Sequence, residues 1–241
     1  MKTTYKHDKV HTTVAVGVFS AFAFVCTVIF HFKAAFLSFD LKDAVMTVGA
    51  MIFGPIYGLA MSVIVSLAEM LTISNTGPYG LIMNILSSVT FVCVGSFIYS
   101  RKRTLGGAAV GMAASVAAMV AVMLGANLII TPFYTRMTAS EVAKMIPTLL
   151  LPFNLTKGLF NASLVFLIYK PVSAAVSRAG FASVTTGAPG DAPIAVITKP
   201  DKKDGKRTDI SSVVIIVALA VAVLCLVFFF LKLGGSVSIG K

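Results

Sequence analysis

Charged residues are scarce in this sequence. They make up 12% of the 241 residues, while 57% are hydrophobic and the mean hydropathy is +0.94. A water-soluble domain needs more charge than this to cover its surface, so the composition fits a protein whose solvent is lipid. The alternation of apolar and polar residues that a membrane β-barrel requires is also missing. These absences predict an all-α membrane protein.

Sequence motifs for catalysis and for metal binding are missing as well. The three cysteines, Cys26, Cys93 and Cys225, lie far apart inside apolar runs and lack the spacing of a metal site or a disulfide. The sequence has no HExxH motif, no paired intramembrane aspartates and no Ser/His dyad, which disfavours an intramembrane enzyme. We therefore expect no catalytic residue, no metal and no cofactor. Because there is no P-loop, any ATP hydrolysis must come from another protein.

Acidic residues are few relative to basic ones, and the formal net charge is +11. The basic residues are clustered between apolar segments, where they set membrane orientation, so we do not interpret them as a nucleic-acid site. The favoured orientation has a cytoplasmic N-terminus and an extracellular C-terminal tail. If residues 44–72 formed a single span, the N-terminus would lie outside. Both interpretations place Arg101, Lys102, Arg103 and the later basic linker in the cytoplasm.

Apolar runs of about 20 residues predict the helices that cross the membrane. The run at 44–72 would be about 43 Å long as one helix, which is too long for one upright span. Gly54-Pro55 interrupts it, and a proline inside a helix removes a hydrogen bond and clashes with the preceding turn. We therefore predict a tight turn there, and a polar loop at 131–147. The predicted helices are 12–30, 43–53, 56–73, 79–99, 105–130, 149–169 and 211–231.

These elements predict five segments. A cytoplasmic tail at 1–11 precedes a six-helix membrane domain at 12–171. Residues 172–210 are rich in Ala, Gly, Pro, Thr and Lys, which is typical of a flexible linker. An additional transmembrane helix at 211–231 and a tail at 232–241 follow.

Polar residues within the apolar helices are the candidates for function, because a charge in the middle of a membrane is costly. Lys157 lies about a turn and a half into the sixth helix, with Asn154 and Asn161 on the same face. Two amides and an ammonium suit a planar, polar ligand that is uncharged or mildly electron-rich. Alternatively, Lys157 reaches the membrane surface and the two asparagines join helices.

Other polar residues admit two interpretations each. Asn127, near the outer end of the fifth helix, could equally form a hydrogen bond between helices. Tyr134 could lie at the membrane interface or stack on a ligand. Asp43 is predicted to cap the second helix. Glu69 is a candidate proton relay, although a relay built on one acid is a weak hypothesis. Asn84 lies one turn into the fourth helix.

Four groups of residues occur in order along residues 12–171. They are Phe39-Asp40-Leu41-Lys42-Asp43; Phe53-Gly54-Pro55-Ile56-Tyr57-Gly58; Gly77-Pro78-Tyr79-Gly80-Leu81-Ile82-Met83-Asn84; and Asn127 with Pro132-Phe133-Tyr134. A fifth and most specific group is Leu151-Pro152-Phe153-Asn154-Leu155-Thr156-Lys157-Gly158. Together they resemble the S components, the substrate-binding subunits of energy-coupling-factor (ECF) vitamin transporters, and most closely the riboflavin-specific type.

This resemblance implies a six-helix bundle with an outward-facing vitamin pocket and no catalysis, to which this chain adds one C-terminal transmembrane helix. The ligand is then riboflavin. The implied ligand contacts are Asn127, Asn154 and Lys157, with Asn84, Asp40, Tyr134 and Gly80 as further candidates. The alternating acceptors and N–H of an isoalloxazine edge agree with the amides and the ammonium.

The resemblance also implies partners: a membrane-embedded coupling protein and two cytoplasmic ATPases. Gly17 and Ala21 form a small-residue spacing that lets another helix approach closely, although this pattern is common in apolar sequence. The surface around them resembles the one that meets the coupling protein.

Two features depart from the family pattern. The family has a proline soon after the aspartate at position 43, where this chain has Ala44-Val45. The helix at 211–231 has no family counterpart; if it is accessory, truncation after Arg178 leaves ligand binding intact. The alternatives that stay open are another vitamin, flavin mononucleotide, and a stand-alone proton-coupled transporter that uses Glu69.

Overall fold

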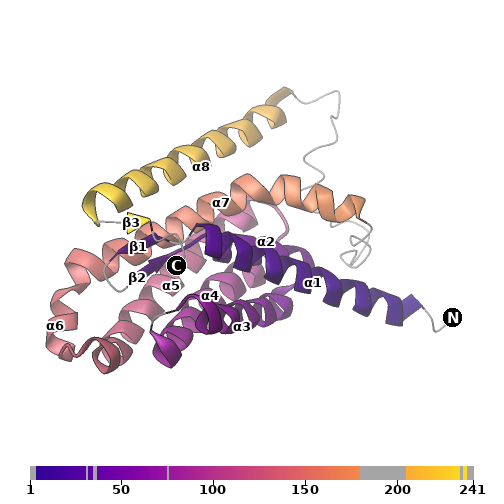
Figure 1. Cartoon of the computed structure of the whole chain (residues 1–241). Coiled ribbons are helices and arrows are strands. Elements are labelled where there is room, and N and C mark those ends of the chain that lie inside the picture. Colours follow the sequence, from indigo (N-terminus) through magenta and orange to yellow (C-terminus); the bar gives the residue numbers. More distant parts are fainter. Residues whose placement is uncertain are drawn as a thin grey trace.

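A computed structural model describes residues 4–30, 32–34, 37–74, 76–179, 205–233 and 236–237. The predicted linker lies largely outside these residues, and so do residues 1–3 of the first predicted tail and much of the second. Figure 1 shows a bundle of long helices with a short sheet near one end. The helices are α1 (Thr4–Ile29), α2 (Lys42–Phe53), α3 (Pro55–Thr72), α4 (Gly77–Arg101), α5 (Leu105–Thr135), α6 (Ala139–Lys144), a π-helical turn η1 (Ile146–Leu150), α7 (Leu151–Arg178) and α8 (Gly205–Lys232).

The helices confirm the predicted membrane fold class. Within the described residues, six helices are long and apolar enough to cross a bilayer. They comprise α1, α3, α4, α5, α8 and the continuous stretch of η1 and α7. The 12-residue α2 is shorter than a span, and every one of its residues is buried among the other helices. It packs against α1, α3, α4 and α7, so it is the centre of the bundle.

The turn between α2 and α3 is where the sequence predicts it. Gly54 has φ +114°, a backbone conformation that side chains other than glycine rarely adopt. Its N–H donates to the Ala50 carbonyl at 2.8 Å and ends α2. Pro55 then begins α3 at the first helical position, where no backbone donor is needed.

The polar loop predicted at 131–147 is wrong, because this segment is mostly helical. Helix α5 continues through Pro132 to Thr135, where the Thr135 hydroxyl donates to the Thr131 carbonyl. A capping box then starts α6: Thr138 and Glu141 bond each other's backbone N–H groups. The backbone N–H and the hydroxyl of Thr138 hold the pKa of the Glu141 carboxyl below its usual value.

A small antiparallel sheet, which the sequence pattern does not predict, lies at one end of the bundle. Its strands are β1 (Phe32–Ala34) and β2 (Leu37–Phe39), between α1 and α2, and β3 (Ser236–Val237), after α8. The strand order is β2-β1-β3. Strands of two or three residues are too short to show a period-2 pattern in sequence. The sheet brings the C-terminal segment to the loop between α1 and α2 (Figure 1).

The two small residues predicted to meet a partner helix lie on an open side of α1. Gly17 and Ala21 are both exposed, and a Cβ placed on Gly17 would meet nothing within 4 Å. Contacts inside the chain use another side of α1, which includes the buried Ala15, Val16 and Ala23. The Gly17–Ala21 surface therefore stays accessible within the described chain.

Candidate functional site

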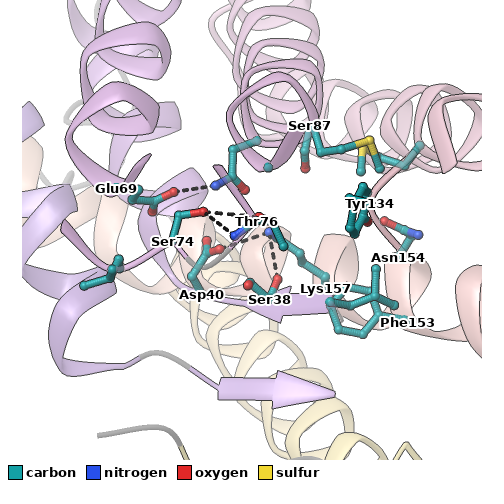
Figure 2. Close-up of a pocket in the computed structure, with 16 residues that line it drawn as sticks. Ser38, Asp40, Glu69, Ser74, Thr76, Ser87, Tyr134, Phe153, Asn154 and Lys157 are labelled. Atoms are coloured by element: carbon teal, nitrogen blue, oxygen red, sulfur yellow. Dashed lines mark hydrogen bonds and ion pairs between the residues drawn. The ribbon is translucent and has the colours of Figure 1, made fainter. Parts of the chain in front are cut away.

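A cavity of about 260 Å³ opens between the β2 segment and helices α3, α4, α5 and α7 (Figure 2). Polar side chains from four separate elements reach it, and aromatic rings complete its wall. Its polar lining residues are Ser38, Asp40, Glu69, Ser74, Thr76, Asn84, Ser87, Asn154 and Lys157, and its aromatic ones are Tyr134 and Phe153. The cavity is thus apolar on some walls and provides directed hydrogen-bonding groups on others, as small-molecule sites do.

Six of the seven residues predicted to contact a ligand line this cavity. They are Asp40, Gly80, Asn84, Tyr134, Asn154 and Lys157. Gly80 is needed for packing, because a Cβ there would collide with the hydroxyl of Thr76. The carboxamide of Asn154 is buried in the wall, and its Nδ2 donates to the Leu150 carbonyl at 2.8 Å.

Asn127 is the predicted residue that does not line the cavity. It is fully buried; its Nδ2 donates to the Met123 carbonyl at 2.7 Å, and its Oδ1 accepts from the Thr131 hydroxyl at 2.9 Å. Thr131 in turn lies 3.4 Å from the hydroxyl of Tyr134. In this conformation Asn127 contacts the cavity wall indirectly, through Met123 and through Thr131 and the Tyr134 hydroxyl.

Lys157 is buried, and its ammonium binds the segment between β2 and α2. Its Nζ donates to Asp40 Oδ2 at 3.0 Å and to the Ser38 carbonyl at 3.3 Å. An ammonium has three N–H groups, so these two acceptors among the described residues leave one for a ligand. The membrane-surface alternative for Lys157 is excluded by this burial, since the head group is not in solvent.

The Lys157–Asp40 pair is one end of a longer buried chain of charges. Lys42 Nζ lies 3.8 Å from Asp40 Oδ2 and also forms an ion pair with Glu69. Glu69 Oε2 accepts from Asn84 Nδ2 at 2.7 Å. Burying charges is costly unless they are paired and hydrogen-bonded. These linked ion pairs and hydrogen bonds therefore hold α7, the segment at Asp40, α2, α3 and α4 in one arrangement around the cavity.

Glu69 Oε1 and Asp43 Oδ2 are buried carboxylate oxygens close to the cavity, and neither accepts a hydrogen bond from the described residues. A buried acceptor without a donor is costly, so a ligand N–H or O–H reaching Glu69 would remove a penalty. Sequence reasoning assigned Glu69 at most to a proton relay. The sequence feature that marks Glu69 is its position as an acidic residue inside an apolar helix. This feature indicates a functional residue but does not say what the function is.

Asn161 fixes the entry to α2, a role the sequence did not indicate. Its Oδ1 accepts from the Ala44 N–H at 3.0 Å, and its Nδ2 donates to the Asp40 carbonyl at 3.0 Å. The predicted cap by Asp43 is wrong: Leu41 is at the N-cap, without a side-chain hydrogen bond. Asp43 instead accepts from the Ser88 hydroxyl on α4, because the α7 amide already occupies the helix start.

Aromatic rings from α4 and α5 stack beside the cavity. The Tyr79 ring lies parallel to Phe133, with centroids 6.2 Å apart, and nearly parallel to Tyr134 at 6.1 Å. Figure 2 shows Tyr134 and Phe153 on the same side of the cavity as Asn154. Flat apolar surfaces next to amide and ammonium groups suit a ligand with a planar ring and a polar edge.

The known proteins that are similar to this chain are transporters or transporter components. The family model described as ECF transporter, substrate-specific component, matches residues 11–173. The riboflavin transporter FmnP of Bacillus subtilis (strain 168) is 27% identical over 178 residues, which cover 68% of this chain and 94% of FmnP. The riboflavin transporter RibU of Staphylococcus aureus (strain TCH60) is 25% identical over 174 residues, which cover 68% of this chain and 92% of RibU.

A solved structure has the same fold. It is the S component of a bacterial ECF transporter, which matches with a TM-score of 0.60 and 24% identity, over 69% of this chain and 98% of that one. The family match ends at residue 173, so helix α8 lies beyond it.

Proposed function

Because this chain belongs to the family of substrate-specific components of ECF transporters, we propose that it is the riboflavin-binding membrane subunit of such an importer. The family is one of transporter components and not of enzymes. In this proposal the chain captures riboflavin outside the cell. It then delivers the vitamin inward together with a membrane-embedded coupling protein and two cytoplasmic ATPases.

The observation that supports a flavin ligand is the chemistry of the cavity. Lys157 offers an N–H donor, Asn154 lies beside it on α7, and Glu69 Oε1 offers an acceptor. The edge of an isoalloxazine ring presents carbonyl acceptors and an N–H, which such groups complement. Tyr134 and Phe153 give the ring faces an apolar surface. The names of the two similar riboflavin transporters support the same ligand.

The size of the cavity supports a small ligand. Its volume of about 260 Å³ is near the lower end of the usual range of roughly 300–1,000 Å³ for small-molecule sites. The β2 segment forms one wall, and a modest outward shift of that segment would enlarge the cavity.

The orientation of the chain follows from the same proposal. If the cavity opens to the outside, strand β3 and the C-terminal tail are extracellular, because β3 pairs with β1 at the cavity end. The N-terminus is then cytoplasmic. The exposed Gly17–Ala21 surface of α1 is suited to close contact with a helix of the coupling protein.

The test is to purify the full chain in detergent and to record its visible absorption and its quenching of added riboflavin fluorescence. We expect a flavin spectrum or saturable quenching at about one equivalent. Lys157→Ala and Asn154→Ala should each weaken binding by about 1–3 kcal/mol, because a buried partner is left unpaired. Lys170→Ala, an exposed lysine of α7, is the matched control and should bind normally.

Other outcomes have distinct meanings. A colourless protein that does not quench riboflavin fluorescence would point to another vitamin. Tighter binding of flavin mononucleotide than of riboflavin would identify the phosphate ester as the ligand. Unchanged affinity in both cavity variants would remove the site assignment. Uptake that persists without an ATPase partner, and is lost in Glu69→Gln at unchanged binding, would favour a proton-coupled transporter. The contacts of Glu69 with Lys42 and Asn84 favour a binding role.

A further inference from the structure

Helix α8 packs against the bundle through one defined side. Its buried residues are Ala218, Ala222, Cys225 and Phe229, a spacing of four, three and four that places them on one helix face. This face lies along α7 (Figure 1). Two apolar helices in lipid gain little from the hydrophobic effect, so close packing of this kind is what holds them together. The two alanines permit that approach, and Phe229 is the large side chain at the cavity end.

The Phe229 ring is inserted into an aromatic cluster directly behind the cavity wall. It is fully buried, with its centroid 4.6 Å from that of Phe39 and 6.2 Å from that of Phe153. Phe39 also lies 5.0 Å from Phe160. Phe153 lines the cavity, and Phe39 immediately precedes Asp40. Helix α8 therefore supports both the α7 wall and the loop wall of the site.

The chain after α8 adds a second attachment to the same loop. Strand β3 pairs with β1 in an antiparallel register, with Phe32 opposite Val237 and Lys33 opposite Ser236. On its other edge β1 pairs with β2, which contributes Leu37 and Ser38 to the cavity lining. A strand added to an edge supplies main-chain hydrogen bonds that fix the position of the edge. We use the term β1–β2 loop for strands β1 and β2 together with the adjoining Asp40. Strand β3 holds this loop from outside through its pairing with β1.

The position of this loop determines the geometry of the ligand site. Its Ser38 carbonyl and its Asp40 carboxylate are the two acceptors of the Lys157 ammonium. If the loop moves outward, the cavity opens and Lys157 loses both partners. Any contact that restrains the loop therefore restrains ligand exit and keeps Lys157 in place.

We propose that Phe229 together with strand β3 forms a strap that holds the β1–β2 loop closed over the ligand and slows its release. Phe229 is a positioning residue in this role, since it acts through Phe39 and Phe153. That the ligand is riboflavin rests on the proposed function. The sequence alone suggests that truncation after Arg178 leaves binding intact; the strap instead predicts that removing α8 accelerates ligand dissociation.

The first experiment measures ligand release from the full chain in lipid nanodiscs, as recovery of riboflavin fluorescence after an excess of a non-fluorescent competitor is added. Phe229→Ala should speed release about 3- to 10-fold, the change expected from losing aromatic packing. Deletion of residues 234–241 should also speed release, because it removes the pairing of β3 with β1. Phe228→Ala is the matched control, because that neighbouring ring is exposed on the lipid side. Its release rate should match that of the unaltered chain.

The second experiment fixes the strap covalently and does not depend on protein stability. Opposed positions of an antiparallel pair lie close enough for a disulfide. In a background with Cys26, Cys93 and Cys225 replaced by serine, F32C with V237C should slow release when oxidised, and reduction should restore it.

The third experiment does not require riboflavin. In the same background, Ser38→Cys is labelled by a water-soluble maleimide without ligand; labelling should be faster with Phe229→Ala than with Phe228→Ala. If the unaltered chain fails to bind riboflavin, the proposed function is wrong. The labelling rates still test whether the strap restrains the loop, because they are measured without a ligand. Equal labelling in the two variants, or release unchanged by both Phe229→Ala and the disulfide, would overturn the strap.

Discussion

The ion pair between Lys157 and Asp40 allows a structural role of Lys157 to be separated from its proposed role in ligand binding. Replacing Lys157 by methionine leaves the Asp40 carboxylate buried without the ammonium that lies 3.0 Å from it, while the Lys42 ammonium is farther away, at 3.8 Å. Replacing Asp40 by asparagine leaves the ammonium buried with the Ser38 carbonyl. Breaking a buried ion pair from one side lowers the free energy of unfolding by about 3–5 kcal/mol, because one charge stays uncompensated. The double variant Lys157→Met/Asp40→Asn buries neither charge.

We therefore expect the double variant to lose less stability than the sum of the two single variants, with a coupling of up to about 3 kcal/mol. If Lys157 binds riboflavin as proposed, riboflavin binding should stay weak in the double variant, because the N–H donor of Lys157 is still missing. Unfolding in mixed micelles, followed by helical circular dichroism, measures the stability, and fluorescence quenching measures the binding. Lys170→Met on the same helix is the control. Additive losses would show that the pair is not coupled, and recovery of binding with stability would show that Lys157 is purely structural.

Two further substitutions test how the helices around the site are held. Asn161→Ala removes the amide that bonds two backbone groups at the start of α2. Because both groups are then unsatisfied, the free energy of unfolding should fall by about 2–6 kcal/mol. An equally stable variant would mean that water replaces the amide. Gly111→Leu should cost about 1–3 kcal/mol by overpacking, because even a Cβ there would lie 2.9 Å from the Gly95 carbonyl oxygen and force α4 and α5 apart. Gly125→Leu on α5, where nothing lies within 4 Å, should leave melting in detergent unchanged.

The sequence predicted the helical elements well because their causes are local. Long apolar runs and the Gly54-Pro55 interruption are visible in the chain itself, and the structure has helices and a turn there. The prediction of a loop at 131–147 failed, because in the structure α5 continues through Pro132 to Thr135 and α6 follows. A proline is tolerated in a membrane helix where neighbouring groups satisfy the freed backbone, which depends on tertiary packing.

The predicted site residues converge on one cavity, but their partners could not be predicted. Lys157 and Asp40 are 117 positions apart in the chain, and nothing in either local sequence says that they pair. The same holds for Asn161, whose spacing with Lys157 suggested a ligand contact and whose amide instead bonds the start of α2. For α8, an almost uniformly apolar sequence shows no period, so the face that carries Phe229 is decided by packing against α7.

The pairing of β1 with β3 also sets an order of events during synthesis. The two strands lie about 200 residues apart, since Lys33 is opposite Ser236. At a synthesis rate of about 5–20 residues per second, β1 waits for its outer neighbour for roughly 10–40 s. The bundle that contains the cavity can assemble earlier, from helices that leave the ribosome first. The strand that pairs with β1 is therefore translated well after the cavity walls, and a nascent chain arrested before α8 would have these walls but not β3.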